Sequence, residues 1–478
     1  MKIIEKYRSL SKEVKASTAY TVCNILTKCL SLITLPLFTR MMSTEEYGLS
    51  TVYASTATIV VIFTSLQLPY GSLLTAMIKF KEDRNGYLSS LCMISTTLTA
   101  VYMILCILFR NIMVQWLELP FFLILLMGVE MLFATAQSAW MGFQRFEFQY
   151  KNVVIVTFCT AVLSTIVSLF AVIYSTQKGM AKVCSNALVT CLVGLAIFIQ
   201  LLYKGRRPFE KKYWKFAFSF NVPLIPYYLS QVIFNQSDRL MINKICGRGD
   251  AAIYGVAYSL ATILTFVVSA IHSSYTPWLF ERIDRKEFAG SKKVTIFLSA
   301  GIAFMLLGII ALAPEIIYIM AGKKYAEAMW VVPPVAMSVL LLYYSDLFDC
   351  LLFFYEAKIF LAISAILSAG INVVLNAFFI SRFSFIAAAY TTLASYLILA
   401  VVDYIYMLKI CRMKKISNDI YDIKSLIGIF LIFIGLGFAA MSLYEMPIIR
   451  YSIIMAVFVV LFLFRNKLMK LFQNMKKD

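Results

Sequence analysis

Long apolar runs alternate with short polar links along almost the entire chain. A helical span of a bilayer needs about 20 predominantly apolar residues, and irregular backbone is not tolerated against lipid. Runs that approach or meet this length occur at residues 16–40, 48–70, 87–109, 117–140, 152–174, 182–203, 216–241, 251–275, 294–319, 328–352, 359–380, 384–408, 425–444 and 447–464. The pattern predicts an all-α polytopic membrane protein with about 14 transmembrane helices.

The composition agrees with a chain that lies mostly in a membrane. Of 478 residues, 61% are hydrophobic and 14% are charged, whereas a soluble domain is about half apolar and a quarter charged. The formal net charge of +19 would suit a nucleic-acid partner, but the basic residues stand in short links between apolar runs and form no separate basic module. We therefore expect no nucleic-acid partner.

The sequence lacks the features of an enzyme or of an ATP-driven pump. The polar stretches between apolar runs are too short for a soluble domain, and no G-x-x-x-x-G-K-[ST] phosphate loop occurs. The ten cysteines include no C-x-x-C pair. We expect no catalytic residues, no metal centre and no cofactor. If the chain transports a substrate, a gradient of Na⁺ or H⁺ is the expected energy source.

Lysine and arginine positions predict which side of the membrane each link faces, because cytoplasmic links hold the excess of these residues. With the N-terminus inside, the inner segments carry 32 of the 44 basic residues and the outer segments carry 11. Lys28 alone lies deep within a run. Both termini are therefore predicted to be cytoplasmic, and residues 1–15 are predicted to form a basic, amphipathic surface segment.

The two halves of the chain carry a weak internal repeat. Tyr47-Gly48 and Tyr254-Gly255 lie 207 residues apart, and the window from Tyr47 to Val61 has six identities in fifteen positions at this offset. A duplicated unit with an even number of spans keeps its orientation, as in many secondary transporters. The predicted divisions are an N-lobe at 16–203, a cytoplasmic linker at 204–215, a C-lobe at 216–409, two appended spans within 425–464 and a basic cytoplasmic tail at 465–478.

Several segments resemble a known family of exporters. They are LPLFTRMMSTEEYG from Leu35, PLIPYYLSQVIFNQSDRLMINKICG from Pro223, AAIYGVAYS from Ala251 and AGKKYAEAMW from Ala321. Together they resemble the polysaccharide transporters, the Wzx-type O-antigen and capsule flippases, of the multidrug/oligosaccharidyl-lipid/polysaccharide (MOP) exporter superfamily. The resemblance implies a two-lobe, MATE-like transporter of the bacterial inner membrane. It would move an undecaprenyl-diphosphate-linked oligosaccharide to the outer leaflet by ion-coupled alternating access, with membrane lipids and glycan polymerase or assembly proteins as further partners.

Other roles stay open at this point. A drug/cation antiporter of the same superfamily shares the fold, but an organic cation favours a carboxylate in the N-lobe cavity, and the first run offers Asn24 and Lys28 instead. A lipid II flippase and a non-transporting scaffold of a glycan assembly complex are the remaining alternatives. Transport of labelled lipid-linked glycan into vesicles that contain only this protein would separate a flippase from a scaffold.

A polar pair in the first run is expected to line the substrate cavity. An unpaired ammonium at the bilayer centre costs roughly 2.5 to 3.5 kcal/mol, so Lys28 should face water or an anion. The structural alternative pairs Lys28 with Glu130 or with another acid. Asn24 lies one turn before Lys28, and the repeat offset places Gln231 and Asn235 at the matching positions of the seventh run. Arg40 and Arg239 lie nearer the outer face and could receive the diphosphate there. The candidate residues for the substrate diphosphate and cavity are Lys28, Asn24, Arg40, Gln231, Asn235 and Arg239.

Two groups of residues are candidates for ion coupling. Glu130 lies near the middle of the fourth run, where a carboxylate either accepts a proton or is satisfied by a neighbour such as serine or glutamine. Resemblance to lipid II flippases implies a sodium site with oxygen ligands from spans 7, 11 and 12. The residues of suitable type are Asp238, Asn372, Asn376 and Thr391. An asparagine replaces the second acid of that pattern, which lowers the expected affinity, and Asp238 alternatively pairs with Arg239.

Three further features have competing interpretations. Pro223 and Pro226 open the seventh run and predict a gate hinge, with static kinks as the alternative. Asp346 and Asp349 lie near Glu356 and Lys358, which predicts a structural ion-pair cluster ahead of a substrate role. His272, the single histidine, is expected to be a hydrogen-bonded structural residue.

Overall fold

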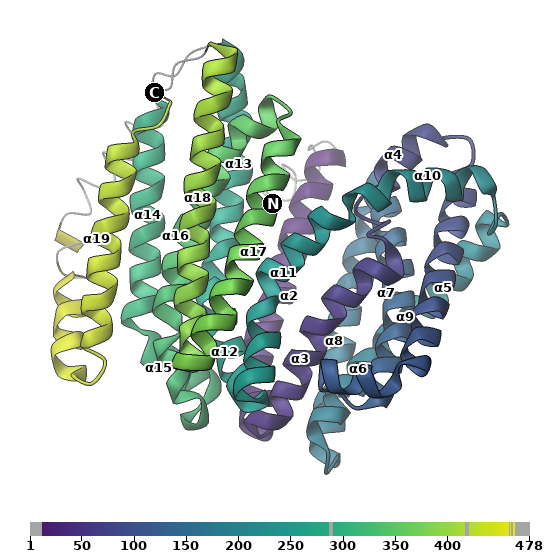
Figure 1. Ribbon diagram of the computed structural model, residues 1–478, viewed down its shortest axis with the longest axis horizontal. Helices are drawn as coiled ribbons and strands as arrows, with labels where there is room; N and C mark the ends of the chain where they lie inside the picture. The colour runs from purple at the N-terminus through teal and green to yellow at the C-terminus, as the bar shows by residue number, and fades with distance from the viewer. Residues whose placement is uncertain (1–11, 286–289, 416–419, 458, 460–461, 464–478) are drawn as a thin grey trace, which may run out of the picture. The chain divides into compact units, whose positions relative to one another are not determined.

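The computed structural model describes residues 12–285, 290–415, 420–457, 459 and 462–463. Throughout these ranges the regular secondary structure is helical, without a strand (Figure 1). The predicted N-terminal surface segment lies largely outside the described residues, and the predicted tail at 465–478 lies entirely outside them.

Twelve helices in the described part of the chain are long and apolar enough to cross a bilayer. They correspond to twelve of the fourteen predicted spans. The seventh predicted span, at 216–241, is divided among three helical segments and carries too many polar side chains to meet the same criterion. The last one, at 447–464, is represented by an apolar helix at Pro447–Val457, and part of the remainder lies outside the described residues. The predicted all-α, multi-pass fold class is confirmed.

The chain forms two compact units, of which the first comprises Met1–Ala252. Within it, α9 packs against α5, α7 and α8, α3 packs against α7, α9 and α11, and α2 packs against α8. The helices of this unit are α2 (Lys12–Met41), α3 (Thr44–Ser65), α4 (Leu73–Lys79), α5 (Arg84–Leu108), α6 (Arg110–Leu117), α7 (Phe121–Phe146), α8 (Tyr150–Tyr174), α9 (Lys178–Gly205), α10 (Lys211–Asn221), the 3-10 helix η1 (Val222–Leu224), α11 (Ile225–Cys246) and the start of α12 (Arg248–Ala261).

The second compact unit comprises Ile253–Asp478. Its central helix is α16, which packs against α13, α14, α18 and α19 and has 83% of its apolar window buried. The helices of this unit are the rest of α12, η2 (Thr262–Leu264), α13 (Thr265–Arg285), α14 (Ser291–Ala311), α15 (Ala313–Ala321), η3 (Lys323–Trp330), α16 (Val332–Phe354), α17 (Lys358–Phe383), α18 (Ile386–Lys414) and α19 (Ile423–Ser442).

The internal repeat is visible in the helix boundaries and in the packing. The offset of 207 carries the first residue of α5, Arg84, onto the first residue of α14, Ser291. It carries the starts of α8 and α9 to within one residue of the starts of α17 and α18. The packed pairs α7–α9 and α8–α9 of the first unit likewise recur as α16–α18 and α17–α18 in the second. Each unit therefore contains a copy of the same helical arrangement.

The compact units divide at a different place from the predicted lobes. The predicted boundary lies in the linker at 204–215, whereas the first unit extends to Ala252 because α11 packs against α3. Ser55 of α3 donates a hydrogen bond to Gln236 of α11 at 3.1 Å. The backbone N–H of Gly249 donates to Glu45 at 3.2 Å. The predicted functional lobes stay a prediction, since packing within the chain is a different criterion from the repeat.

Local sequence explains how α3 begins and why it carries a Tyr-Gly motif. Ser43 and Glu46 form a capping box, in which the Ser43 N–H donates to Glu46 Oε2 at 2.8 Å and the Glu46 N–H donates to Ser43 Oγ at 3.2 Å. A Cβ atom at Gly48 would lie 2.1 Å from the carbonyl oxygen of Arg248. Glycine at position 48 therefore permits the close approach of α3 to the start of α12.

Candidate functional site

The predicted cavity residues of α2 lie on an exposed part of that helix. Asn24, Lys28 and Arg40 are all exposed. Glu130 accepts a hydrogen bond from the Tyr53 hydroxyl instead of pairing with Lys28. Within the described residues, no ion pair joins Lys28 to Glu130. Pairing of Lys28 with another acid and its cavity role both stay predictions.

The matching residues of α11 are exposed in the same way. Gln231 and Asn235 are exposed and lie one turn apart, at the repeat positions of Asn24 and Lys28. The Asn235 amide donates to the carbonyl of Gln231 at 2.8 Å, which leaves its side-chain oxygen available to other groups. Each copy of the repeat thus presents a polar pair at equivalent positions of equivalent helices.

Gln236 and Asp238 of α11 are turned toward the protein. Gln236 accepts hydrogen bonds from Ser55 at 3.1 Å and from Arg239 Nη1 at 2.6 Å. Asp238 is 2% exposed. Polar groups within a span are tolerated where protein partners satisfy them, and the contacts of Gln236 with α3 provide such partners. The predicted roles of Asp238 in sodium binding and of Arg239 in substrate binding stay predictions.

Glu130 joins α7 to α3 through a short hydrogen bond. Its Oε2 atom accepts from the Tyr53 hydroxyl at 2.6 Å, a length typical of a hydrogen bond to a carboxylate. A neighbour therefore satisfies Glu130, as one interpretation predicted, but that neighbour is a tyrosine and not a serine or glutamine. No local sequence pattern indicates that Tyr53 is the partner, because Tyr53 is 77 residues away from Glu130 along the chain. Its role in ion coupling stays a prediction.

Three of the predicted sodium ligands meet in the second unit. Asn372 and Asn376 of α17 and Thr391 of α18 are all buried. The Asn376 amide donates to Asn372 Oδ1 at 3.1 Å, and the Thr391 hydroxyl donates to Asn376 Oδ1. The oxygen atoms are therefore engaged in a hydrogen-bonded chain between two helices. Asp238 belongs to the first unit, so the complete set of four ligands stays a prediction.

The two prolines of the predicted hinge lie where helical structure changes. Pro223 lies in the 3-10 helix η1, and Pro226 lies in the first turn of α11. Proline lacks an N–H donor and is tolerated in the first turn of a helix, so both positions separate α10 from α11. The break is observed, and motion about it stays a prediction.

Three carboxylates lie on neighbouring helices of the second unit, with Asp403 fully buried and Asp346 and Asp349 half-buried. Asp403 of α18 is fully buried, accepts a hydrogen bond from Ser345 and acts electrostatically on Asp346 and Asp349 of α16. Asp349 Oδ1 has no hydrogen-bond partner among the described residues. Over the same part of the chain, no ion pair includes Asp346, Asp349 or Glu356. The side chain of Lys358, the expected basic partner, lies outside the described part of the structure, so the ion-pair cluster stays a prediction.

The neighbour of these carboxylates is the single histidine. His272 Nε2 lies 3.3 Å from the carbonyl oxygen of Asp346 and 3.4 Å from Cys350 Sγ. The predicted hydrogen-bonded histidine is therefore observed. Sequence reasoning missed Asp403 because it belongs to another helix, and only the packing of α16 against α18 brings the three acids into one region.

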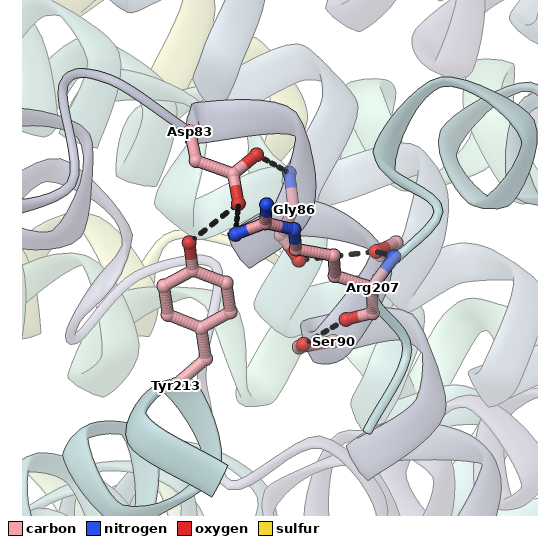
Figure 2. Close-up of polar contacts among 6 residues, drawn as sticks. Asp83, Gly86, Ser90, Arg207 and Tyr213 are labelled. Carbon is pink, nitrogen blue, oxygen red and sulfur yellow. Dashed lines mark hydrogen bonds and ion pairs between the residues drawn. The ribbon is translucent and has the colours of Figure 1, made fainter. Parts of the chain in front are cut away.

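A separate polar cluster fixes the predicted linker to α5 (Figure 2). Asp83, which caps α5, accepts hydrogen bonds from the Gly86 N–H at 3.0 Å and from the Tyr213 hydroxyl at 2.6 Å. Arg207 Nη1 forms an ion pair with the same carboxylate at 3.1 Å. Burial and the neighbouring Asp83 carboxylate raise the pKa of Tyr213 to about 12.

The backbone of Arg207 is held in the same cluster. Its N–H donates to Ser89 Oγ at 3.2 Å, and its carbonyl oxygen accepts from the Ser90 hydroxyl at 2.5 Å. A Cβ atom at Gly205 would lie 2.2 Å from the carbonyl oxygen of Asn85, so α9 also approaches α5 closely here. The segment between α9 and α10 is therefore docked on α5 by both side-chain and backbone contacts.

These features define a class: a multi-pass membrane protein with the fold of MOP-superfamily transporters. The chain is similar to the lipid II flippase MurJ in its inward closed conformation, with a TM-score of 0.65 and 15% identity, covering 91% of this chain and 99% of that one. It is also similar to an inward-facing multidrug resistance MATE transporter of the MOP superfamily, with a TM-score of 0.55 and 11% identity, covering 81% and 99% of the two chains. At these identities the likeness concerns the fold.

Sequence comparison identifies the family. Residues 14–283 match the family described as "Polysaccharide biosynthesis protein", and since this is more than half of the chain, the chain belongs to that family. An uncharacterized membrane protein of Haemophilus influenzae is 21% identical over 278 residues, which are 57% of this chain and 66% of that relative. The match thus spans just under two-thirds of the relative's length. The resemblance drawn from the motifs is confirmed for the family, and the fold is similar to that of MOP-superfamily transporters.

Proposed function

We propose that this protein translocates an undecaprenyl-diphosphate-linked oligosaccharide from the inner to the outer leaflet by ion-coupled alternating access. The oligosaccharide would be a repeat unit of an O-antigen, capsule or exopolysaccharide. Membership of the polysaccharide biosynthesis family carries the proposal, and the fold shared with a lipid II flippase supports it. The protein works in the bacterial inner membrane with both termini in the cytoplasm.

The exposed polar residues of the two repeat copies are the proposed contacts for the substrate. Lys28 supplies a point charge for the diphosphate, and Asn24, Gln231 and Asn235 offer amide groups to the glycan. Arg40 is exposed at the end of α2 and offers a second positive charge. Arg239 is held by Gln236 and offers a third.

Na⁺ or H⁺ is the proposed coupling ion, and two sets of residues would serve it. Glu130, bonded to Tyr53, is the candidate for a proton, and the oxygen-bearing residues of α11, α17 and α18 are the candidates for sodium. Asp238→Asn is expected to abolish sodium-dependent transport. An equal sodium response in the variant and the parent protein would exclude the sodium site.

The decisive experiment reconstitutes the purified protein alone in vesicles with a labelled undecaprenyl-diphosphate-linked oligosaccharide. We expect transport by the parent protein, none by Lys28→Ala and partial transport by Lys28→Arg. Lys151→Ala is the matched control, because Lys151 is an exposed lysine at the start of α8 outside the proposed cavity.

The outcomes separate the competing functions. Vesicles that never transport the glycan, while a glycan assembly complex still requires the protein, would identify a scaffold. Transport of an organic cation or of lipid II in preference to the oligosaccharide would identify the antiporter or the lipid II flippase. Full transport by Lys28→Ala at normal protein levels would show that Lys28 is not part of the substrate site.

A further inference from the structure

A pocket of about 360 Å³, lined by both polar and apolar side chains, lies among α2, α3, α8 and α9 within the first compact unit. This volume is at the lower end for a small-molecule site, and it suits a headgroup better than a whole lipid-linked oligosaccharide. The polar residues that line it include Thr27, Ser31, Thr34, Ser164, Lys182 and Asn186. None of the residues named in the sequence-based substrate set lines this pocket.

Lys182 is the charged residue of the pocket, and neutral groups surround it. Its Nζ atom donates to Ser50 Oγ at 3.1 Å and lies 4.0 Å and 4.7 Å from the ring centroids of Tyr47 and Phe38. The Ser50 hydroxyl donates to the Tyr47 carbonyl at 2.7 Å, so its oxygen is oriented to accept from the lysine. Among the described residues, no carboxylate forms an ion pair with Lys182.

Glu46 of α3 is engaged by other donors. Glu46 Oε2 accepts from the Ser43 N–H at 2.8 Å, and Glu46 Oε1 accepts from the Lys178 N–H at 3.2 Å. An ammonium has three N–H donors, and one hydrogen bond with two aromatic faces leaves donor capacity unused at Lys182. Lys182 is half-buried, and a partly desolvated cation without a counter-charge is unfavourable, so the arrangement favours an anion in the pocket.

Asn186 places a second donor one turn after Lys182. Its Oδ1 atom accepts from the Ser164 hydroxyl at 2.6 Å and from the Ser168 hydroxyl at 2.8 Å. Two hydroxyl donors on one oxygen fix the orientation of the amide, so the two N–H groups of Nδ2 point away from them. Residues four apart on a helix share a face, and Asn186 therefore adds neutral donors beside the ammonium.

The α2 side of the pocket supplies acceptors. The Thr27 hydroxyl donates to the Asn24 carbonyl at 3.0 Å, Ser31 to the Thr27 carbonyl at 3.0 Å, and Thr34 to the Ser31 carbonyl at 3.0 Å. Hydroxyls that donate to their own helix keep oxygen lone pairs free for an incoming hydroxyl. The pocket thus combines a cation and amide donors on α9 with acceptors on α2.

We propose that this pocket binds the phosphate-bearing headgroup of the transported lipid, with Lys182 as the counter-charge for the phosphate and α2 accepting from sugar hydroxyls. The identity of the anion rests on the proposed function. Phosphate esters also occur in phospholipid headgroups, so the experiment separates these two sources. The sequence-based substrate set does not include Lys182. Lys182 is the first residue of the predicted span 182–203 and therefore counts with the link that precedes the span.

Binding of inorganic pyrophosphate to the purified full chain tests the pocket without requiring transport. We expect Lys182→Met to weaken binding about ten- to hundred-fold, because a hydrogen bond to a charged group is lost. Lys182→Arg should retain part of the affinity. Lys178→Met is the matched control: Lys178 lies one turn earlier on α9, donates to the Met41 carbonyl at 2.7 Å and does not line the pocket.

A thermal melt distinguishes a binding role from a structural one. Removing an uncompensated charge should leave the melting temperature of Lys182→Met equal to or above that of the parent protein. A lowered melting temperature with unchanged pyrophosphate affinity would overturn the proposal, as would equal affinities of Lys182→Met and Lys178→Met. Glucose, which is neutral, should bind much more weakly than pyrophosphate.

Two further outcomes are decisive. If pyrophosphate binds in detergent but not in phosphatidylcholine nanodiscs, a phospholipid headgroup fills the pocket and the assignment to the transported lipid is overturned. If Lys182-dependent binding persists while reconstituted vesicles fail to transport the glycan, the proposed function fails and the anion site stands. If the Lys182→Met variant transports the glycan fully and binds pyrophosphate as the parent protein does, the pocket is not a phosphate site. The proposed function would then be unaffected.

Discussion

The two compact units share a helical arrangement but hold half-buried or buried charges of opposite sign. In the first unit, Lys182 lies among a serine hydroxyl and two aromatic rings. In the second, Asp346, Asp349 and Asp403 lie in one region with His272 as their neighbour. The two copies of the duplicated fold therefore contain charged side chains of different sign.

The repeat register shows how this divergence is accommodated. At an offset of 207, Lys182 corresponds to Ala389, and Asp346 and Asp403 correspond to Ala139 and Ala196. These three charged residues thus have an alanine at the equivalent position of the other unit, whereas Asp349 corresponds to Gly142. Alanine is small and needs no hydrogen-bond partner, so it fits either copy. A charged residue could therefore be introduced into one copy without disturbing the packing of the other.

The largest expected effect comes from placing an acid of the second unit at its equivalent position in the first. Ala139 is fully buried, so Ala139→Asp should lower the free energy of unfolding by about 3 to 5 kcal/mol, the cost of an uncompensated buried charge. Ala139→Asn is the matched neutral control for size. Asp349→Asn in the second unit should not lower stability, because it removes a like charge. Thermal melts of the four proteins provide the measurement, and equal losses for Ala139→Asp and Ala139→Asn would contradict the role of charge.

Reversing the charge of the first unit should have the next largest effect. Lys182→Glu gives the pocket the sign of the second unit and should weaken pyrophosphate binding by more than about a hundred-fold, through loss of a donor and gain of repulsion. Asp403→Asn changes a charge in the other unit and should leave this affinity unchanged. Isothermal titration of both variants gives the comparison. A similar loss in Asp403→Asn would mean that anion binding does not belong to the first unit.

A smaller effect is expected at the cluster that docks the linker on α5. Tyr213→Phe removes the hydroxyl that Asp83 accepts at 2.6 Å and should cost about 1.5 kcal/mol, a typical value for a hydrogen bond to a charged group. The pKa of Tyr213 is raised to about 12 in the folded protein from an ordinary value of 10. Its contribution to stability is therefore fully present below pH 10 and is lost as the pH rises through 12.

The alkaline dependence itself provides the measurement. Unfolding curves between pH 8 and pH 12 should show a falling difference between the parent protein and Tyr213→Phe. The second unit offers the contrast, since the repeat position of Asp83 is Gly290, which has no side chain to form such a cluster. If the difference in the free energy of unfolding between the two proteins stays constant across this range, the neutral hydroxyl of Tyr213 does not stabilise the fold by donating to Asp83.

The smallest effect is expected at the start of α19 in the second unit. Hydrogen bonds from the Ser425 hydroxyl and N–H lower the pKa of Asp422 below its ordinary value. Its contribution is therefore present above that ordinary value and is lost as the pH falls through the lower pKa of the folded state. Asp422→Asn keeps a capping oxygen but should lose this acid sensitivity. Hydrogen-exchange protection of the Ser425 amide, compared between mildly and strongly acidic solutions, would detect the change, and identical pH profiles would contradict it.

The sequence by itself determined the membrane class, most helix positions and the duplication. Span length and apolar content are local properties, so twelve of the predicted spans coincide with apolar helices of the described chain. The repeat offset, drawn from six identities, carries Arg84 onto Ser291, the first residues of α5 and α14. The motifs around Leu35 and Pro223 were specific enough to indicate the family that residues 14–283 confirm.

Only the tertiary structure decided which polar groups meet. Glu130 pairs with Tyr53 at 77 residues' separation, Lys182 with Ser50 at 132 and Asp403 with Ser345 at 58. Apolar sequence specifies that a helix forms but says little about which face meets which neighbour, because many lipid-compatible side chains are interchangeable on its surface. The partner of a polar residue in a span is therefore set by helix packing, and for this reason the pocket around Lys182 and the acids around Asp403 could be found only in the folded chain.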